Sequence, residues 1–239
     1  GYNIVIADNF SNSEEAVIER LKAITGKIPV HLNLDITNKE ALFQFWSKNS
    51  DIDSVIHFAA HKAVGESVAK PLKYYHNNLV GLINLLEVGM NFKLENIVFS
   101  SSCTVYGQPD ILPVTEQTPL AKAESPYGNT KKISEEILFD VVKSGSPLRV
   151  IALRYFNPIG AHPSGLLGEL PIGVPNNLVP YITQTAAGIR GELKVFGNDY
   201  NTPDGTCIRD FIDVNDLAEA HISALLYLEI GRASCRERV

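Results

Sequence analysis

The chain reads VFSSSCTVYG over residues 98–107 and PYGNTK over residues 126–131. The apolar start of the first segment predicts a buried strand, which delivers a run of hydroxyl side chains at its end. The second segment opens a predicted helix over 127–143. Tyr127 and Lys131 are four residues apart, so their side chains share one face of that helix, about one turn apart. A hydroxyl cluster and a tyrosine–lysine pair are therefore expected close together.

This combination of residues favours proton transfer. A phenol with a pKa near ~10 is a poor base at neutral pH, but an adjacent ammonium group favours its phenolate form. Tyr127 is thus the candidate catalytic base, with Lys131 as its cationic neighbour. Ser102 ends the neighbouring strand and can hydrogen-bond the same substrate hydroxyl. The alternative is a solvated surface pair, because Tyr-x-x-x-Lys also occurs on helices by chance. The serine run and the Val-Tyr-Gly sequence favour the catalytic interpretation.

Strands and helices alternate along the chain. Period-two apolar runs predict strands, and apolar residues three and four apart predict helices. The expected strands cover 2–7, 30–34, 55–58, 96–100, 148–153, 193–196 and 208–212. The expected helices cover 13–25, 38–48, 127–143, 178–188, 214–228 and a long stretch from Pro71. The alternation predicts an α/β fold with a doubly wound parallel sheet and a smaller, truncated substrate-binding domain.

A dinucleotide-binding unit consists of a strand, a glycine-rich turn and a helix, with an acidic residue at the end of the next strand. This chain has the acidic residue, Asp8, without the preceding unit. We therefore expect a Rossmann-like sheet whose first strand is missing, and a chain that does not form a working enzyme as it stands. Asp8 favours NAD over NADP, because its carboxylate accepts hydrogen bonds from ribose hydroxyls and repels an extra phosphate.

Composition excludes several classes of protein. The formal net charge of −6 argues against general affinity for nucleic acid or anionic membranes. The sequence has no apolar run of ~18 residues and no basic-then-apolar leader, so no membrane association is expected. Three scattered cysteines make neither a disulfide framework nor a zinc pattern, which favours a reducing, cytoplasmic location and no metal site.

Seven longer runs resemble the UDP-glucose 4-epimerase family of extended short-chain dehydrogenases/reductases. They cover residues 8–13, 58–67, 74–78, 153–165, 175–178, 196–200 and 204–210, and the resemblance extends over residues 1–228. Three places depart from the family pattern. Ala60-His61 stands where Gly-Leu is frequent, Cys103 where alanine is usual, and residues 211–213 read Phe-Ile-Asp where Tyr-Ile-His is common.

The resemblance implies roles for individual residues. It implies NAD as the cofactor, with Asp8, Asn9, Asn12 and Ser13 on the adenosine ribose side and Asp35 and Ile36 beside the adenine. It implies Phe58, Ala59, Lys62, Asn77, Tyr127, Lys131 and Phe156 around the rest of the cofactor, chiefly the nicotinamide. For the UDP-sugar it implies Lys62, Ser102, Tyr127, Asn157, Asn177, Leu178, Phe196 and Arg209. Asn157, Asn177 and Phe196 have ordinary alternatives as turn or core residues.

The resemblance also implies a division of the chain. Residues 1–154 are expected to form the NAD-binding domain, incomplete at its N-terminus, and residues 155–229 to begin the UDP-sugar-binding domain with returns to the sheet. Residues 230–239 continue no pattern and read like translated sequencing adapter, so they are set aside. The chain is therefore expected to be a fragment, and the family further implies a homodimer.

The implied reaction is the reversible inversion of C4 in UDP-galactose and UDP-glucose, a step of galactose metabolism, through a 4-keto sugar. Cys103 and Thr104 stand where related dehydratases and decarboxylases carry extra acid–base residues, which disfavours those reactions. UDP-glucuronate 4-epimerase and other NAD-dependent nucleotide-sugar enzymes remain alternatives, as does a non-catalytic nucleotide-sugar-binding fragment. Acceptance of N-acetylated sugars and fusion to a mutarotase depend on sequence after residue 229.

Overall fold

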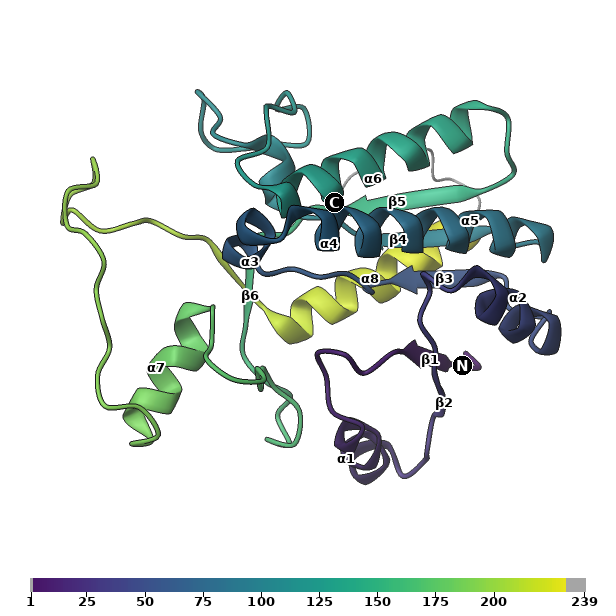
Figure 1. Ribbon diagram of the computed structural model, residues 1–239, viewed down its shortest axis with the longest axis horizontal. Helices are drawn as coiled ribbons and strands as arrows, with labels where there is room; N and C mark the ends of the chain where they lie inside the picture. Colours follow the sequence, from purple (N-terminus) through teal and green to yellow (C-terminus); the bar gives the residue numbers. More distant parts are fainter. Residues whose placement is uncertain (1, 231–239) are drawn as a thin grey trace. The chain divides into compact units, whose positions relative to one another are not determined.

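The computed structural model describes residues 2–230, and the chain's elements alternate between strands and helices (Figure 1). The strands are β1 (Val5–Asp8), β2 (Val30–Asn33), β3 (Ser54–His57), β4 (Asn96–Ser100), β5 (Arg149–Leu153), β6 (Asn157–Ile159) and β7 (Phe211–Asp213). The α-helices are α1 (Ala16–Thr25), α2 (Lys39–Lys48), α3 (Val64–Ala69), α4 (Pro71–Tyr75), α5 (Gly81–Asn91), α6 (Pro126–Lys143), α7 (Leu178–Ala186) and α8 (Val214–Glu229). A π-helix, η1 (His76–Val80), joins α4 to α5, and a 3-10 helix, η2 (Cys103–Tyr106), follows β4.

The chain divides into two compact units. The larger unit contains residues 7–9, 32–155 and 218–230, and the smaller unit contains residues 2–6, 10–31 and 156–217. The larger unit holds β3, β4 and β5 with α2 to α6 and most of α8. The smaller unit holds the parallel pair β6–β7 together with α1 and α7.

A three-stranded parallel sheet in the order β3-β4-β5 forms the centre of the larger unit. The middle strand is buried throughout, and successive side chains leave it on opposite faces. Ile97 and Phe99 pack into one core with apolar residues of α2, α5 and α6. Val98 packs on the other face against Leu225 and Leu228 of α8. Helices thus cover both faces of this sheet, as expected for a doubly wound architecture.

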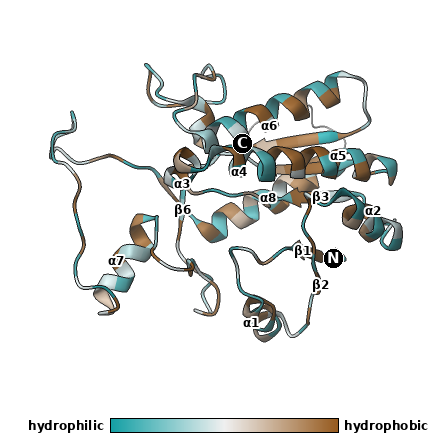
Figure 2. Cartoon of the chain, viewed as in Figure 1, coloured by the Kyte–Doolittle hydropathy of each residue, from teal (hydrophilic) through white to brown (hydrophobic). Residues whose placement is uncertain are grey.

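The helices that cover the sheet are amphipathic. Hydrophobic and hydrophilic stretches alternate along α6 (Figure 2). Leu138 of α6 is almost fully buried, whereas Glu136 and Asp140 are exposed. Trp46 of α2 is also fully buried and contributes the largest side chain of this core. The apolar stripe of each helix therefore fixes which face meets the sheet.

The long helix expected from Pro71 is interrupted by the π-helix η1 before it continues as α5. Just after the interruption, the backbone of Gly81 approaches the Ile36 side chain so closely that an added Cβ would lie 2.8 Å from Ile36 Cδ1. One turn later, the Asn84 amide donates to the carbonyl oxygens of Ile36 and Thr37 at 3.1 and 2.9 Å. These contacts anchor α5 against the segment that follows β2.

The structure corrects the sequence predictions at several points. Residues 193–196 are not a strand. The strands form three sheets (β1-β2, β3-β4-β5 and β6-β7), and the separation of the first two agrees with the expected Rossmann-like sheet that lacks its first strand. The short elements α3, η2 and β6 had not been predicted. Residues 231–239, which include most of the tail set aside above, lie outside the described residues. Within residues 2–230, no helix is both long and apolar enough to span a bilayer.

Candidate active site

The serine run marks the place where β4 ends. Ser102 is extended, with φ −157° and ψ 148°, and it caps the 3-10 helix η2 by accepting a hydrogen bond of 3.3 Å from the Thr104 amide. After η2, Gly107 has φ +59°, and a Cβ there would lie 2.6 Å from the Lys122 carbonyl oxygen. The strand, the cap and this glycine turn together fix Ser102 at the carboxyl edge of the sheet.

Helix α6 begins at a position that places Tyr127 in its first turn. Ser125 is the N-cap, and its hydroxyl accepts a hydrogen bond of 3.1 Å from the Gly128 amide, while Pro126 occupies the first helical position. Gly128 lies against η2, where an added Cβ would be 3.2 Å from Thr104 Cβ. The small residue after Tyr127 therefore lets α6 approach the segment that carries Ser102.

Lys131 is buried, and its side chain reaches the end of β4. Its Nζ donates a hydrogen bond of 2.5 Å to the Ser100 carbonyl oxygen and lies 4.8 Å from the centroid of the Phe99 ring. Burial lowers the pKa of Lys131 to about 8, although the charge of Glu135 acts in the opposite direction. The His57 ring stacks on the Phe99 ring, which Lys131 also contacts. Burial together with the Lys131 charge lowers the pKa of His57 to about 3.

Tyr127 is held as a neutral phenol in this environment. Burial raises the pKa of Tyr127 to about 12, hydrogen bonding with Ser102 lowers it, and the neighbouring Tyr155 and Cys103 raise it again. The sequence argument expected the Lys131 ammonium beside the phenol to favour phenolate. The ammonium instead bonds the Ser100 carbonyl, so stabilisation of phenolate requires a further positive charge at the site.

A charged cluster lies behind these residues. The Glu135 carboxylate accepts a short two-pronged contact from the Arg154 guanidinium and a hydrogen bond of 2.5 Å from the Ser101 hydroxyl. The Arg154 side chain is only 2% exposed, and its Nη1 donates to the Tyr106 hydroxyl at 3.0 Å. Sequence reasoning missed Glu135, although its spacing of four residues from Lys131 places it on the same face of α6.

Asn78 connects three segments of the larger unit. Its side-chain oxygen accepts from the His61 amide at 2.8 Å, and its side-chain nitrogen donates to the His61 carbonyl oxygen at 3.1 Å. The same nitrogen donates to the Thr130 hydroxyl at 3.0 Å, which in turn donates to the Tyr127 carbonyl oxygen. Asn77, the predicted cofactor residue, donates to Asn78 Oδ1. The π-helix therefore ties the segment after β3 to the first turn of α6.

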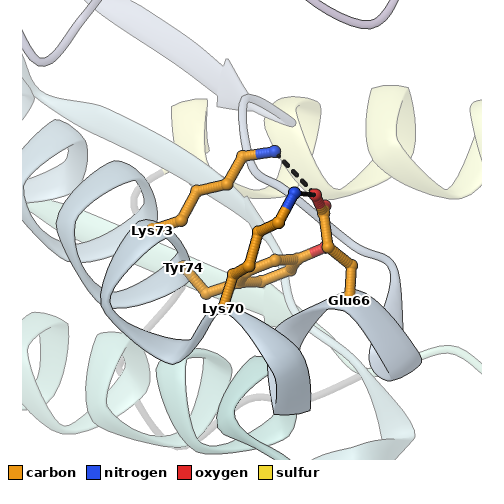
Figure 3. A network of polar contacts seen from close by, with 4 residues as sticks. All are labelled: Glu66, Lys70, Lys73 and Tyr74. Atoms are coloured by element: carbon orange, nitrogen blue, oxygen red, sulfur yellow. Dashed lines mark hydrogen bonds and ion pairs between the residues drawn. The ribbon is translucent and has the colours of Figure 1, made fainter.

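An ion cluster joins α3 to α4, just after the predicted cofactor residue Lys62 (Figure 3). The Glu66 carboxylate pairs with Lys70 and Lys73 at 3.3 and 3.0 Å and accepts a hydrogen bond of 3.0 Å from the buried Tyr74. Hydrogen bonds from Lys73, Tyr74 and Lys70 lower the pKa of Glu66 to about 2. The cluster holds the two short helices together.

Acidic residues lie at or just after the ends of the two strands of the β1-β2 sheet: Asp8 is the last residue of β1, and Asp35 follows β2 by two residues. The Asp8 carbonyl oxygen accepts from the Leu34 amide at 3.0 Å. Asp35 accepts from the Thr37 amide and hydroxyl at 2.8 and 2.7 Å and from the Asn9 side chain at 3.3 Å. Burial raises the pKa of Asp35, but these hydrogen bonds outweigh it and hold the pKa below its usual value. Asp35 is therefore a carboxylate at neutral pH.

Eleven predicted site residues lie in the larger unit: Asp8, Asn9, Asp35, Ile36, Phe58, Ala59, Lys62, Asn77, Ser102, Tyr127 and Lys131. The smaller unit holds the others: Asn12, Ser13, Phe156, Asn157, Asn177, Leu178, Phe196 and Arg209. There Asn157 begins β6 and donates to the Asp210 carbonyl oxygen at 3.0 Å. Asn177 occupies the N-cap position of α7, where its side chain makes no capping hydrogen bond and donates instead to Glu169. Phe196 is 80% exposed, so it is not the core residue that the alternative suggested.

The model of the NAD dependent epimerase/dehydratase family matches residues 1–233. The matched residues include β4, which leads into the serine run, and α6, which carries Tyr127 and Lys131. The chain belongs to this family, and within it to the UDP-glucose 4-epimerases, as the following relatives show.

Curated relatives match nearly the whole chain. UDP-glucose 4-epimerase 2 of Arabidopsis thaliana is 51% identical over 238 residues, which are 98% of this chain and 67% of the relative. UDP-glucose 4-epimerase of Dictyostelium discoideum is 53% identical over 235 residues, which are 98% of this chain and 68% of the relative. The chain spans about two thirds of the length of the curated relatives that it matches.

Solved structures agree with this assignment. UDP-glucose 4-epimerase from Bifidobacterium longum, in complex with NAD+ and UDP, superimposes with a TM-score of 0.91 at 47% identity, over 94% of this chain and 67% of that one. The enzyme from Stenotrophomonas maltophila, with NAD and formylated UDP-arabinopyranose, gives the same TM-score at 45% identity, over 100% and 69% of the two chains.

Proposed function

We propose that the protein, in its full length, interconverts UDP-galactose and UDP-glucose by inverting C4 of the sugar, with NAD as its cofactor. The observation that carries this proposal is the convergence of Ser102 and Tyr127 where β4 and α6 meet. Lys131 lies one turn further along α6 and is anchored to the same strand end. This set of groups is suited to removing and returning the proton of one hydroxyl.

The residues of the larger unit fit a dinucleotide. Carboxylates at the ends of β1 and β2, from Asp8 and Asp35, are acceptors suited to ribose hydroxyls and to the amino group of adenine. The Lys131 ammonium has three donors, of which one is used on the Ser100 carbonyl oxygen, so the others can bond ribose hydroxyls. Phe58 and Ala59 follow β3 and are exposed, which leaves an apolar surface for a flat ring.

Tyr127 is the group that moves the proton in this proposal. Its phenolate accepts the proton of the C4 hydroxyl, and Ser102 hydrogen-bonds that hydroxyl so that it is aimed at Tyr127. NAD, when bound, accepts and returns the hydride and brings a positive charge to the site. Since burial raises the pKa of Tyr127 to about 12, this charge is needed to make phenolate accessible at neutral pH. After the 4-keto sugar has turned its opposite face to the site, Tyr127 returns the proton to the oxygen on C4.

The smaller unit supplies the remaining groups of the proposal. Asn157, Asn177, Leu178, Phe196 and Arg209 are proposed to bind the UDP-sugar, and Asn12, Ser13 and Phe156 to bind the cofactor. Arg209 is suited to a diphosphate, because a guanidinium forms paired hydrogen bonds to its oxygens.

We also propose that the protein is a cytoplasmic homodimer that does not bind nucleic acid. The formal charge of −6 opposes binding to phosphate backbones. Helices α4, α5 and α6 carry exposed apolar side chains, of which Leu72 is 81% exposed and Phe139 44%. An exposed apolar surface of this kind favours association between protein chains. Sedimentation of the full-length protein decides between one and two subunits.

The test uses the full-length protein that carries this chain. It is incubated with UDP-galactose, with and without added NAD, and UDP-glucose is followed by chromatography. Conversion that falls by about 10²-fold or more in Tyr127→Phe supports the reaction and the base. Tyr181→Phe, a tyrosine of α7, is the matched control and is expected to keep wild-type conversion. A folded, NAD-bearing enzyme that leaves UDP-galactose unchanged but inverts UDP-glucuronate would overturn the substrate assignment.

A further inference from the structure

Two cations and one carboxylate share the interior behind the proposed site. Lys131 and Arg154 are buried on α6 and at the end of β5, and Glu135 is the carboxylate that contacts Arg154. His57 also faces Lys131, but its pKa is lowered to about 3 and it is uncharged at neutral pH. Buried charges are stable only when they are paired and hydrogen-bonded, so Glu135 has to serve both cations.

Glu135 also connects the two elements that carry the proposed chemistry. It lies on α6, two turns after Tyr127 and one turn after Lys131. From there its Oε1 accepts from the Ser101 hydroxyl at 2.5 Å, and Ser101 is the residue immediately before Ser102. The backbone of Ser101 is fixed as well, because its amide donates to the Leu153 carbonyl oxygen at 2.9 Å. Any shift of α6 along the sheet would strain this hydroxyl–carboxylate contact.

We propose that Glu135 is a positioning residue, whose carboxylate clamps the strand end carrying Ser102 to the face of α6 carrying Tyr127 and provides the buried counter-charge for Lys131. This inference rests on the proposed function for its kinetic consequences, but not for its electrostatic ones. Glu135 is not itself expected to contact the sugar or the cofactor.

The proposal that Glu135 is the counter-charge of Lys131 has a direct consequence for the pKa of Lys131. Glu135 acts to raise the pKa of Lys131 against the effect of burial, so loss of its charge lowers that pKa further below about 8. Removal of a neighbouring opposite charge shifts a pKa by on the order of one unit or more. Of the other titratable groups in this interior, His57 from β3 interacts with Lys131. Arg154, just after β5, interacts with Glu135 and Tyr106, and Tyr155 and Cys103 interact with Tyr127.

The experiment measures the titration of Lys131 by nuclear magnetic resonance in the full-length protein with ¹³C at the lysine Cε, assigned with Lys131→Met. Glu135→Gln is expected to lower the titration midpoint by on the order of one pH unit. Glu136→Gln changes the neighbouring exposed glutamate and is expected to leave the midpoint unchanged. A Glu135→Gln midpoint equal to that of the wild type overturns the counter-charge.

The proposal that Glu135 clamps the strand end to α6 is tested with Ser101→Ala, which removes only the hydroxyl that donates to Glu135. It is expected to lower kcat by about tenfold, the effect of one lost positioning contact, with KM and the Lys131 midpoint unchanged. Glu135→Asp, which keeps the charge, is expected to restore most of the kcat lost in Glu135→Gln. An unchanged kcat in Ser101→Ala overturns the clamp, and this variant decides the matter if Glu135→Gln does not fold. If the wild type converts no UDP-sugar, the proposed function fails while the Lys131 titration still tests Glu135.

Discussion

Lys131 donates its hydrogen bond to the main-chain carbonyl oxygen of Ser100, at 2.5 Å. The contact joins the second turn of α6 to the last residue of β4 and draws the lysine side chain across the Phe99 ring. It holds the ammonium at a fixed depth below the serine run. The cation of the predicted pair is thus positioned by the sheet.

Replacing this lysine removes both its charge and its anchor. Lys131→Met is expected to lower kcat by about 10²–10⁴-fold, because an orienting cation at a proton-transfer site is lost while the buried volume is nearly kept. Conversion of UDP-galactose by the full-length protein, measured by chromatography, checks this. Lys143→Met at the last turn of α6 is the control, with activity expected to match the wild type. Equal rates in the two variants would remove Lys131 from the mechanism.

The depressed pKa of Lys131 makes stability depend on pH. The group titrates at about 8 when folded and at 10.5 when exposed, so the unfolded chain binds more protons between these values. The free energy of unfolding of the wild type, relative to Lys131→Met, is therefore expected to rise by up to about 3 kcal/mol between pH 8 and 10.5. Urea unfolding of both proteins across this range measures the difference, in which the contributions of the tyrosines cancel. A flat difference contradicts the burial of a charged lysine.

Loss of the side-chain N–H donors of Asn78 is expected to destabilise the protein. Asn78→Asp keeps the side-chain oxygen that accepts from the His61 amide. It replaces the side-chain nitrogen, which in the wild type donates to the His61 carbonyl oxygen, by a second oxygen. We expect the free energy of unfolding to fall by about 2–4 kcal/mol, since the carbonyl and the Thr130 hydroxyl lose a buried partner. Thermal unfolding checks this against Asn91→Asp, an exposed change expected to cost under about 0.5 kcal/mol.

Two helical glycines are predicted to respond in opposite directions to alanine. Gly81→Ala places a Cβ 2.8 Å from Ile36 Cδ1, so the isoleucine must move, and we expect a loss of about 1–3 kcal/mol. Gly65→Ala in α3 meets nothing within 4 Å and is expected to gain about 0.5–1 kcal/mol from helix propensity. Urea unfolding of the two variants measures the change in the free energy of unfolding for each. A destabilised Gly65→Ala would contradict the open space around Gly65.

Local pattern predicted most of the elements in the larger unit. The strand over 96–100 and the helix now seen as α6 follow directly from their apolar periodicity and, for α6, from Ser125 and Pro126 at its start. Residues 193–196 have the alternation of a strand, but in the structure they pair with none. A strand needs its partner's backbone, which no local pattern supplies.

The candidate site was predictable to the level of residue types only. Spacing placed Tyr127 and Lys131 on one face of a helix, and resemblance supplied the cofactor and the sugar nucleotide. The direction of the Lys131 side chain depends on the sheet beneath it, which spacing cannot show. Glu135 could have been found by extending the interval of four residues once more along α6. Arg154, its partner, lies 19 residues later, just after β5, and is a tertiary contact.

The π-helix η1 fits about one more residue into its turn than the α-helices on either side of it. A deletion of one residue within His76–Val80 would therefore restore continuous α-helical winding with only a small rotation of α4 relative to α5. The apolar stripe of α5 would keep its face, but the side chains inside the segment would be displaced, and Asn78 would lose its alignment with His61 and Thr130. The extra residue of this turn thus aims one side chain outside the α-helical period and leaves the surfaces on either side in place.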